Sequence, residues 1–207
     1  MFHRQTVLVL AAWCASVAAG SWAMLEYELR PAATRAAGAR WPAASAVELD
    51  RARPTLVLFL HPHCPCSRAT LHELDVLAST HAGEFVLHVL LVRPPGGAED
   101  WEQTHLARAV RQIRGAVVSC DESGQEAERF GATTSGEALL YAADGRLLFQ
   151  GGLTAARGHE GDSAGRTALT ALIAPALPAT DKPGSRKGME CARTAVYGCP
   201  LFHQPSR

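Results

Sequence analysis

Apolar residues along this chain form one long uncharged run, followed by short apolar runs that alternate with segments of helical spacing. Thr6 to Leu25 carries no charged residue and is long enough to cross the hydrocarbon core of a bilayer as a helix. Beyond Pro54 the pattern indicates buried strands separated by amphipathic helices. It predicts strands at 56–60, 85–92, 116–119, 138–141 and 147–150, and helices at 67–80, 99–114, 122–130 and 164–174.

The order of these elements is β-α-β-α-β-α-β-β-α. Helices between successive strands favour parallel pairs, whereas Asp144-Gly145 joins the last two strands as a hairpin. The sequence therefore predicts an α/β fold in which a mixed sheet lies between two layers of helices.

The same pattern divides the chain into four parts. Residues 1–25 are expected to be a transmembrane anchor, and 26–53, rich in Ala, Arg and Pro, a linker. Residues 54–174 form the predicted folded domain, and 175–207 a C-terminal tail that carries two cysteines.

The apolar run near the N-terminus predicts a single membrane crossing. Arg4 precedes it, which favours a cytoplasmic start, although Arg30, Arg35 and Arg40 follow it. A cleaved signal peptide is the alternative, since Val17-Ala18-Ala19 supplies small residues for cleavage. The apolar run continues beyond that point to Leu25, so we favour a retained anchor. Either interpretation carries the rest of the chain across the membrane. The retained anchor predicts a single-pass protein of a bacterial inner membrane, with its soluble domain facing the periplasm.

The charge balance of the chain limits the classes of partner that it is expected to bind. The chain has 20 basic and 20 acidic residues, and its net charge is zero. Such a balance supplies no general attraction for nucleic acid, so no nucleic-acid partner is expected. The expected contacts are a lipid bilayer through the first helix and a partner protein at the site described next.

The segment His61-Pro62-His63-Cys64-Pro65-Cys66-Ser67 lies between the first predicted strand and the first predicted helix of the domain. Unpaired backbone N–H groups at a helix start stabilise a thiolate. We predict Cys64 as the N-cap, Pro65 as the first helical residue and Cys64 as a reactive thiol. Protonated His61 or His63 would act in the same direction.

These residues resemble a known superfamily. Phe59-Leu60-His61-Pro62-His63-Cys64-Pro65-Cys66 is similar to the strand and active-site turn of thioredoxin-like proteins. Asp121 through Phe130-Gly131, then Leu139-Leu140-Tyr141 and Asp144-Gly145-Arg146, resembles membrane-anchored TlpA-type and peroxiredoxin-type members, and most of all proteins labelled RedB. The resemblance covers roughly residues 54–174. It implies a thioredoxin-like α/β/α sandwich, thiol–disulfide chemistry on protein substrates and no bound cofactor.

Two positions depart from that superfamily. Its members usually have Cys-x-x-Cys, whereas here Ser67 stands three residues after Cys64 and the second thiol is Cys66. Members also have a cis-proline before the penultimate strand, where this chain has Thr134-Ser135-Gly136. These departures put an ordinary reductase activity in doubt.

The thiol that would resolve a mixed disulfide on Cys64 is left open. A Cys64–Cys66 bridge would be strained and easily reduced. Cys191 and Cys199 are the other candidates, or they form a structural disulfide with each other.

In a thioredoxin-like sheet, the strand at 138–141 starts at the edge where the first strand ends. Residues 133–137 and 151–163 are therefore expected to flank the cysteines, which brings in Arg157 and His159. Glycines at 151, 152, 158, 161 and 165 would let backbone approach closely there.

Three functions compete. The first is thiol–disulfide exchange by Cys64 and Cys66. The second is binding of copper by Cys64, Cys66 and His159, as in Sco-type copper chaperones of the same fold, or of zinc by Cys64, Cys66, Cys191 and Cys199. The third is a non-catalytic thioredoxin-like binding module. We favour the first because of the thiolate chemistry expected at a helix start.

Overall fold

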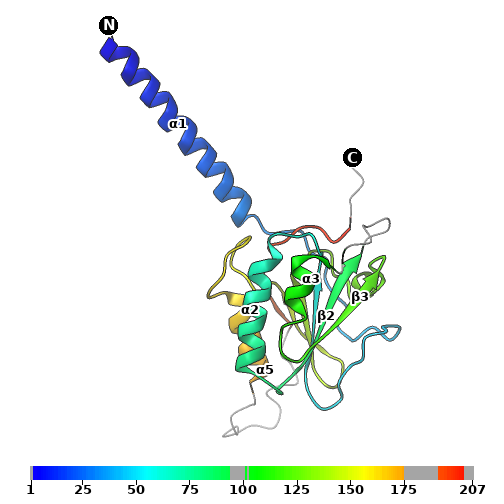
Figure 1. The fold of residues 1–207 in the computed structure, drawn as a ribbon. Coiled ribbons are helices and arrows are strands. Elements are labelled where there is room, and N and C mark those ends of the chain that lie inside the picture. The colour runs from blue at the N-terminus through cyan, green and yellow to red at the C-terminus, as the bar shows by residue number, and fades with distance from the viewer. Residues whose placement is uncertain (1, 94–100, 102, 175–190, 203–207) are drawn as a thin grey trace, which may run out of the picture. The chain divides into compact units, whose positions relative to one another are not determined.

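The computed structural model describes residues 2–93, 101, 103–174 and 191–202, and its chain divides into two compact units, Met1–Arg30 and Pro31–Arg207 (Figure 1). The first unit is one helix, α1 (Phe2–Leu29). Its 28 residues extend for about 42 Å. Residues 3–29 have a mean hydropathy of 1.8, and their apolar side chains are exposed. By length and composition this helix fits a single-pass membrane anchor.

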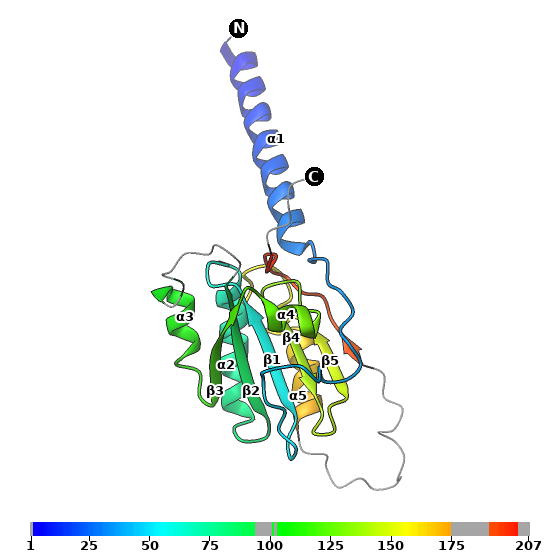
Figure 2. The ribbon, with the colours of Figure 1, turned by 90° about the vertical axis from the view of Figure 1, so that its right-hand side faces the viewer.

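A six-stranded mixed sheet forms the centre of the second unit (Figure 2). Its strand order is β3-β2-β1-β4-β5-β6. β1 is parallel to β2 and antiparallel to β4, so the hairpin of β4 and β5 reverses the direction of the sheet, as predicted. The strands are β1 (Thr55–Leu60), β2 (Val86–Arg93), β3 (Ala116–Glu122), β4 (Glu137–Tyr141), β5 (Leu147–Gly151) and β6 (Ala192–Arg193).

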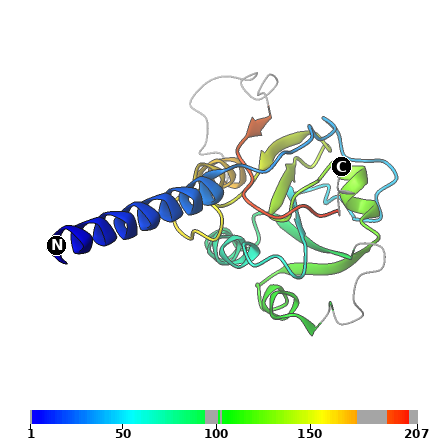
Figure 3. The same cartoon turned by 90° about the horizontal axis from the view of Figure 1, so that it is seen from above.

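Helices cover both faces of this sheet (Figures 2 and 3). The helices α2 (Ser67–Thr80), α3 (His105–Val110) and α5 (Ala164–Ile173) pack into one apolar core. The short helix α4 (Gln125–Phe130) packs into the other. The architecture is therefore the predicted three-layer α/β/α sandwich.

β1 shows why a continuous apolar run was a good sign of a central strand. Its six side chains are all fully buried. Leu56, Leu58 and Leu60 enter the core with α2, whereas Val57 and Phe59 enter the core with α4. A strand covered on both faces needs apolar residues at every position.

The chain before Pro54, which we expected to be a linker, packs against the domain over much of its length. The Trp41 ring lies edge-on to Phe130 and Tyr141, with centroids 5.0 Å from each. The N–H of Leu147 donates to the carbonyl of Ala39 (3.0 Å). The apolar side chains of this segment thus complete the core on the α4 face.

Two helices differ from their expected bounds. α4 begins at Gln125 rather than 122, because β3 continues to Glu122 and Ser123 and Gly124 then turn with positive φ. The Asp121 carboxylate accepts hydrogen bonds from the first turn of α4. α3 covers only the centre of the predicted 99–114 helix, part of which lies outside the described residues.

The C-terminal tail adds a strand that the sequence did not predict. β6 runs parallel to β5, with Phe149 opposite Ala192. The chain then continues beside β5 and beyond it: Thr194 donates to the carbonyl of Gln150, and Leu201 to that of Thr133. The tail therefore reaches from the sheet edge to the segment that precedes β4.

Candidate functional site

The cysteine turn connects the end of β1 to the start of α2. The helix begins at Ser67 with Cys66 as its N-cap residue, so the prediction of Cys64 as N-cap and Pro65 as first helical residue was wrong. The N–H groups of Ser67 and Arg68 donate to the carbonyls of Cys64 (3.2 Å) and Pro65 (3.5 Å). These i→i+3 bonds form a tighter turn before the helix proper and move its start by two residues. Cys64 lies in this turn, and its carbonyl accepts the hydrogen bond from the first helical residue, Ser67.

Three sulfur atoms meet at this turn. The Sγ atoms of Cys64, Cys66 and Cys199 lie within 4.8 Å of one another. Cys199 comes from the C-terminal tail, where its carbonyl accepts a hydrogen bond from the N–H of Ser135 (2.8 Å). The other tail cysteine, Cys191, packs beside the core on the α4 face and is not part of this group. All six cysteines are free thiols in this structure.

Cys64 is held as the most acidic of these three thiols. Its side chain is only 4% exposed, and burial alone would raise its pKa. Hydrogen bonds from the side chains of Ser67, Cys199 and Ser135, and from the Cys199 backbone, outweigh burial and bring the pKa below its usual value. The thiolate is therefore favoured at Cys64.

The pKa values of the other two thiols, Cys66 and Cys199, are raised rather than lowered. Burial and the neighbouring Cys64 charge raise the pKa of Cys66, against a hydrogen bond from Arg157. Burial and the hydrogen bond to Cys64 raise the pKa of Cys199 to about 12. Of the three thiols, Cys64 therefore loses its proton most readily, while Cys66 and Cys199 hold theirs more strongly than an ordinary thiol.

The segment Thr134-Ser135-Gly136 lies against the turn. The Ser135 Oγ atom is 2.8 Å from the Ser67 Oγ atom and accepts a hydrogen bond from the N–H of His61 (2.8 Å). Gly136 has a φ of 91°, and a Cβ there would lie 3.1 Å from the Thr70 hydroxyl. The described peptide bonds are all trans. Where the superfamily has a cis-proline, this chain supplies a hydroxyl group to the reactive turn.

Of the other residues predicted for the site, some lie at the cysteine turn and one is not among the residues around the three sulfurs. Arg157 reaches the site: its guanidinium donates to the Gly198 carbonyl and interacts with Cys66. His61 accepts a hydrogen bond at Nδ1 from the backbone of His63 (3.2 Å). His159 is not among the groups whose ligand atoms gather around the three sulfurs. The group of possible metal ligands in the structure is therefore Cys64, Cys66 and Cys199, and not the predicted Cys64, Cys66 and His159.

A cleft of about 890 Å³ opens beside Cys64. The turn residues His63, Cys64 and Pro65 line one side. Leu106 and Ile113, from α3 and the turn after it, line the other. Neither Cys66 nor Cys199 lines this cleft. Of the three clustered cysteines, Cys64 is thus the one that borders this cleft.

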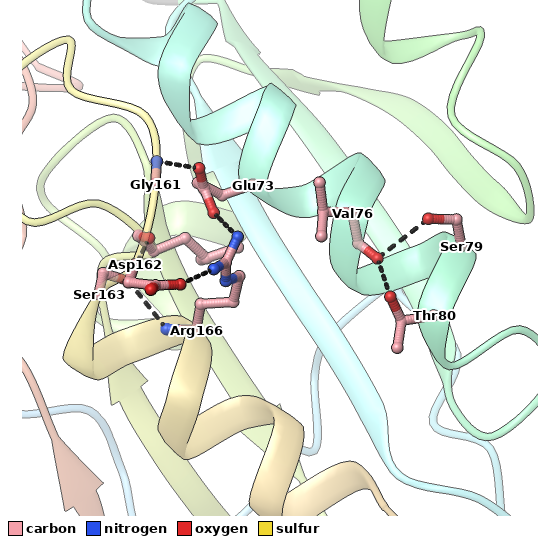
Figure 4. A network of polar contacts seen from close by, with 9 residues as sticks. Glu73, Val76, Ser79, Thr80, Gly161, Asp162, Ser163 and Arg166 are labelled. Atoms are coloured by element: carbon pink, nitrogen blue, oxygen red, sulfur yellow. Dashed lines mark hydrogen bonds and ion pairs between the residues drawn. The ribbon is translucent and has the colours of Figure 1, made fainter.

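A buried ion pair next to the site escaped sequence analysis (Figure 4). The fully buried carboxylate of Glu73 accepts hydrogen bonds from the Gly161 N–H (2.6 Å) and from Arg166 (2.5 Å). Arg166 also pairs with Asp162. These contacts fasten the 151–163 loop, which carries Arg157, to helix α2. The signal in the sequence was a carboxylate on the apolar stripe of α2, between Thr70 and Leu77.

Comparisons with known proteins find similar proteins among the solved structures. No family model matches the chain, and no curated protein matches it. The structure is similar to that of a hypothetical protein from Sinorhizobium meliloti 1021 (TM-score 0.59, 18% identity, covering 81% of this chain and 96% of that one). It is also similar to an uncharacterized conserved protein from Geobacillus kaustophilus (TM-score 0.56, 15% identity, covering 86% and 95%).

A third similar structure is a secreted Mycobacterium tuberculosis disulfide oxidoreductase homologous to E. coli DsbE (TM-score 0.41, 16% identity, covering 61% and 83%). The strand order, the antiparallel β4 and the cysteine turn between central β1 and α2 are features of thioredoxin-like proteins. By this topology the chain has a thioredoxin-like fold, and one N-terminal helix is apolar enough to cross a membrane.

Proposed function

We propose that this chain is a membrane-anchored, extracytoplasmic thiol–disulfide oxidoreductase whose nucleophile is Cys64. The observation that carries the proposal is the setting of the Cys64 sulfur. Cys64 lies in the turn that leads into α2 and borders a cleft, and its sulfur accepts hydrogen bonds that lower its pKa. A thiolate is the attacking form in disulfide exchange.

The reaction begins with attack by Cys64 on a disulfide of the substrate. One sulfur of that disulfide becomes bonded to Cys64, and the other leaves as a thiolate. A second thiol of this chain then attacks Cys64 and releases the first sulfur. The substrate disulfide is reduced by two electrons, and two thiols of this chain become a disulfide. A dithiol reductant on the same side of the membrane restores them.

The substrate is proposed to be a protein segment that carries a disulfide-bonded cysteine. The cleft beside Cys64 has apolar walls from Leu71 and Leu106 and polar groups from Arg68 and Asp75. This mixture suits a peptide, whose backbone and side chains present both kinds of surface.

The proposed location follows from α1. Arg4 precedes the apolar residues of this helix, which favours a cytoplasmic N-terminus and a periplasmic domain in a bacterial inner membrane. An oxidising compartment suits reversible disulfide chemistry.

The proposal is tested by substitution of Cys64 in the full chain, held in detergent. Exchange with an aromatic disulfide reagent should fall by roughly 100-fold or more in Cys64→Ser, since no thiolate remains at the cleft. Cys120→Ser is the matched control: burial and Glu122 raise the pKa of Cys120 to about 12, so its loss should leave the rate unchanged. Wild-type exchange in Cys64→Ser would instead support a non-catalytic binding module.

The cluster of three sulfurs also favours a second candidate, binding of a soft metal ion. Three thiolates suit Cu(I), and Cys64, Cys66 and Cys199 are close enough to share one ion. Copper titration of the reduced chain, followed by the thiolate-to-copper absorption, tests this candidate. It predicts one ion per chain with wild-type and Cys191→Ser protein. Equal affinity in Cys199→Ser would contradict a three-sulfur site.

A further inference from the structure

The C-terminal tail reaches the reactive turn along a path that only glycines permit. A Cβ at residue 151 would lie 2.0 Å from the Thr194 Oγ1 atom, and one at 152 would lie 2.8 Å from the Ala195 carbonyl oxygen. At the far end, a Cβ on Gly198 would lie 1.8 Å from the Ser135 carbonyl oxygen. Contacts this close exclude any side chain, so both the sheet and the tail are shaped for each other.

Further contacts hold the last part of this path. Arg157 donates to the carbonyl of Gly198, and Ser135 donates its backbone N–H to the carbonyl of Cys199. Pro200 forms a β-bridge with Thr134, and the Leu201 side chain is fully buried. The residues before and after Cys199 are therefore both held against the domain.

Within the cluster, Cys199 has the more direct contact with Cys64. The Cys199 thiol and backbone N–H both hydrogen-bond to the Cys64 sulfur, and the two sulfurs lie within 4.8 Å of each other. Cys66 is not among the hydrogen-bond donors that lower the pKa of Cys64. Cys66 is separated from Cys64 by a single residue, so a disulfide between them closes a very small ring. Ser67, at the place of the usual second cysteine, is a hydrogen-bond donor to Cys64 and carries no thiol.

We propose that Cys199 is the resolving thiol: it attacks the mixed disulfide on Cys64 and closes a Cys64–Cys199 bridge between the turn and the C-terminal tail. This inference rests on the proposed function and names the thiol that completes it. The Cys199 proton passes to solvent or to the departing substrate thiolate as the new S–S bond forms. Cys66 remains a thiol in the oxidised chain, and Arg157 positions the tail.

Oxidised glutathione is a suitable probe in full-length protein held in detergent. It should first place one glutathione on Cys64 and release the other. Cys199 then displaces the bound glutathione, so wild-type chain should release two per chain. Peptide mapping without reductant should find Cys64 joined to Cys199. A Cys64–Cys66 bridge as the wild-type product would overturn the inference.

Single substitutions separate the thiols. Cys199→Ser should stop at the Cys64–glutathione adduct, with a yield at least ~10-fold above wild type, because intramolecular resolution is lost. Cys66→Ser and the matched tail control Cys191→Ser should still form the Cys64–Cys199 bridge. Rapid resolution in Cys199→Ser but none in Cys66→Ser would assign the role to Cys66 and contradict the proposal.

The same experiment distinguishes two kinds of failure. Glutathione on Cys64 of the Cys199→Ser chain supports Cys64 as the nucleophile whichever thiol resolves it. No adduct on Cys64 in any variant would overturn the proposed function and, with it, the role of Cys199. The wild-type peptide map involves no substitution, so it tests the bridge even if a variant misfolds.

Discussion

Cys64 and Glu73 are two buried acidic groups near the same helix, and the structure treats them differently. The Glu73 carboxylate is fully buried and paired with the Arg166 guanidinium at 2.5 Å (Figure 4). The Cys64 sulfur is 4% exposed, and the groups that lower its pKa are hydroxyl, thiol and amide donors without charge.

The difference teaches which buried anion is available for chemistry. A carboxylate paired with a guanidinium is neutralised and fixed, and it fastens the 151–163 loop to α2. Neutral donors stabilise a thiolate without pairing it with a countercharge, so the anion is not neutralised by a fixed ion pair. We therefore interpret Glu73 as structural and Cys64 as reactive.

Loss of the Arg166 guanidinium that pairs with Glu73 is expected to have the largest effect, on the free energy of unfolding. In Arg166→Met the carboxylate remains buried without its partner, so the free energy of unfolding should fall by about 3 kcal/mol. Urea unfolding of the full chain in detergent measures this change. Arg51→Met, at an exposed position, should cost less than about 0.5 kcal/mol. Equal effects at both positions would mean that the buried pair contributes little.

Displacement of the C-terminal tail is expected to have the second largest effect, on the yield of the Cys64–Cys199 disulfide. In Gly198→Ala the new methyl group would overlap the Ser135 carbonyl, so Cys199 should withdraw from Cys64. We expect the yield of the Cys64–Cys199 disulfide to fall by roughly 10-fold as the effective concentration of Cys199 drops. Gly38→Ala is the control, because a Cβ there meets nothing closer than 3.6 Å. An unchanged disulfide yield in Gly198→Ala would contradict the account of the tail.

Removing one neutral donor should give the smallest effect. In Ser67→Ala the Cys64 thiolate loses a hydrogen bond, so the pKa of Cys64 should rise toward that of an ordinary thiol. The pH at half-maximal alkylation of Cys64 measures the change. Ser79→Ala is a matched control, since that hydroxyl bonds to the Val76 carbonyl at the other end of α2. The same alkylation midpoint of Cys64 in Ser67→Ala and Ser79→Ala would show that Ser67 does not lower the pKa of Cys64.

The same lowered pKa sets the sign of a pH effect on stability. Because the folded chain favours the Cys64 thiolate, this group adds stability above the pKa of the unfolded thiol. That contribution is lost as pH falls through the lower, folded pKa. The difference in unfolding free energy between wild type and Cys64→Ser should therefore shift in favour of wild type as pH rises through this window. A difference that is constant with pH would contradict the shift.

Sequence patterns predicted the parts of this structure that depend on local order. The apolar run at 56–60 and the helical spacing at 67–80 gave β1 and α2 to within one residue. The position of Cys199 depends instead on contacts between residues far apart along the chain. The glycines at 151 and 152 indicated a close backbone approach, but nothing in their spacing identified the tail as the segment that approaches.

The pH dependence of Cys64 alkylation in the full reduced chain tests the central claim most directly. Mass spectrometry should follow each cysteine separately, so that Cys120 serves as an internal reference. We predict that Cys64 reaches half-maximal reactivity at a pH below that of an ordinary thiol, while Cys120 stays unreactive until strongly alkaline pH. A Cys64 midpoint at or above that of an ordinary thiol would contradict the activated nucleophile.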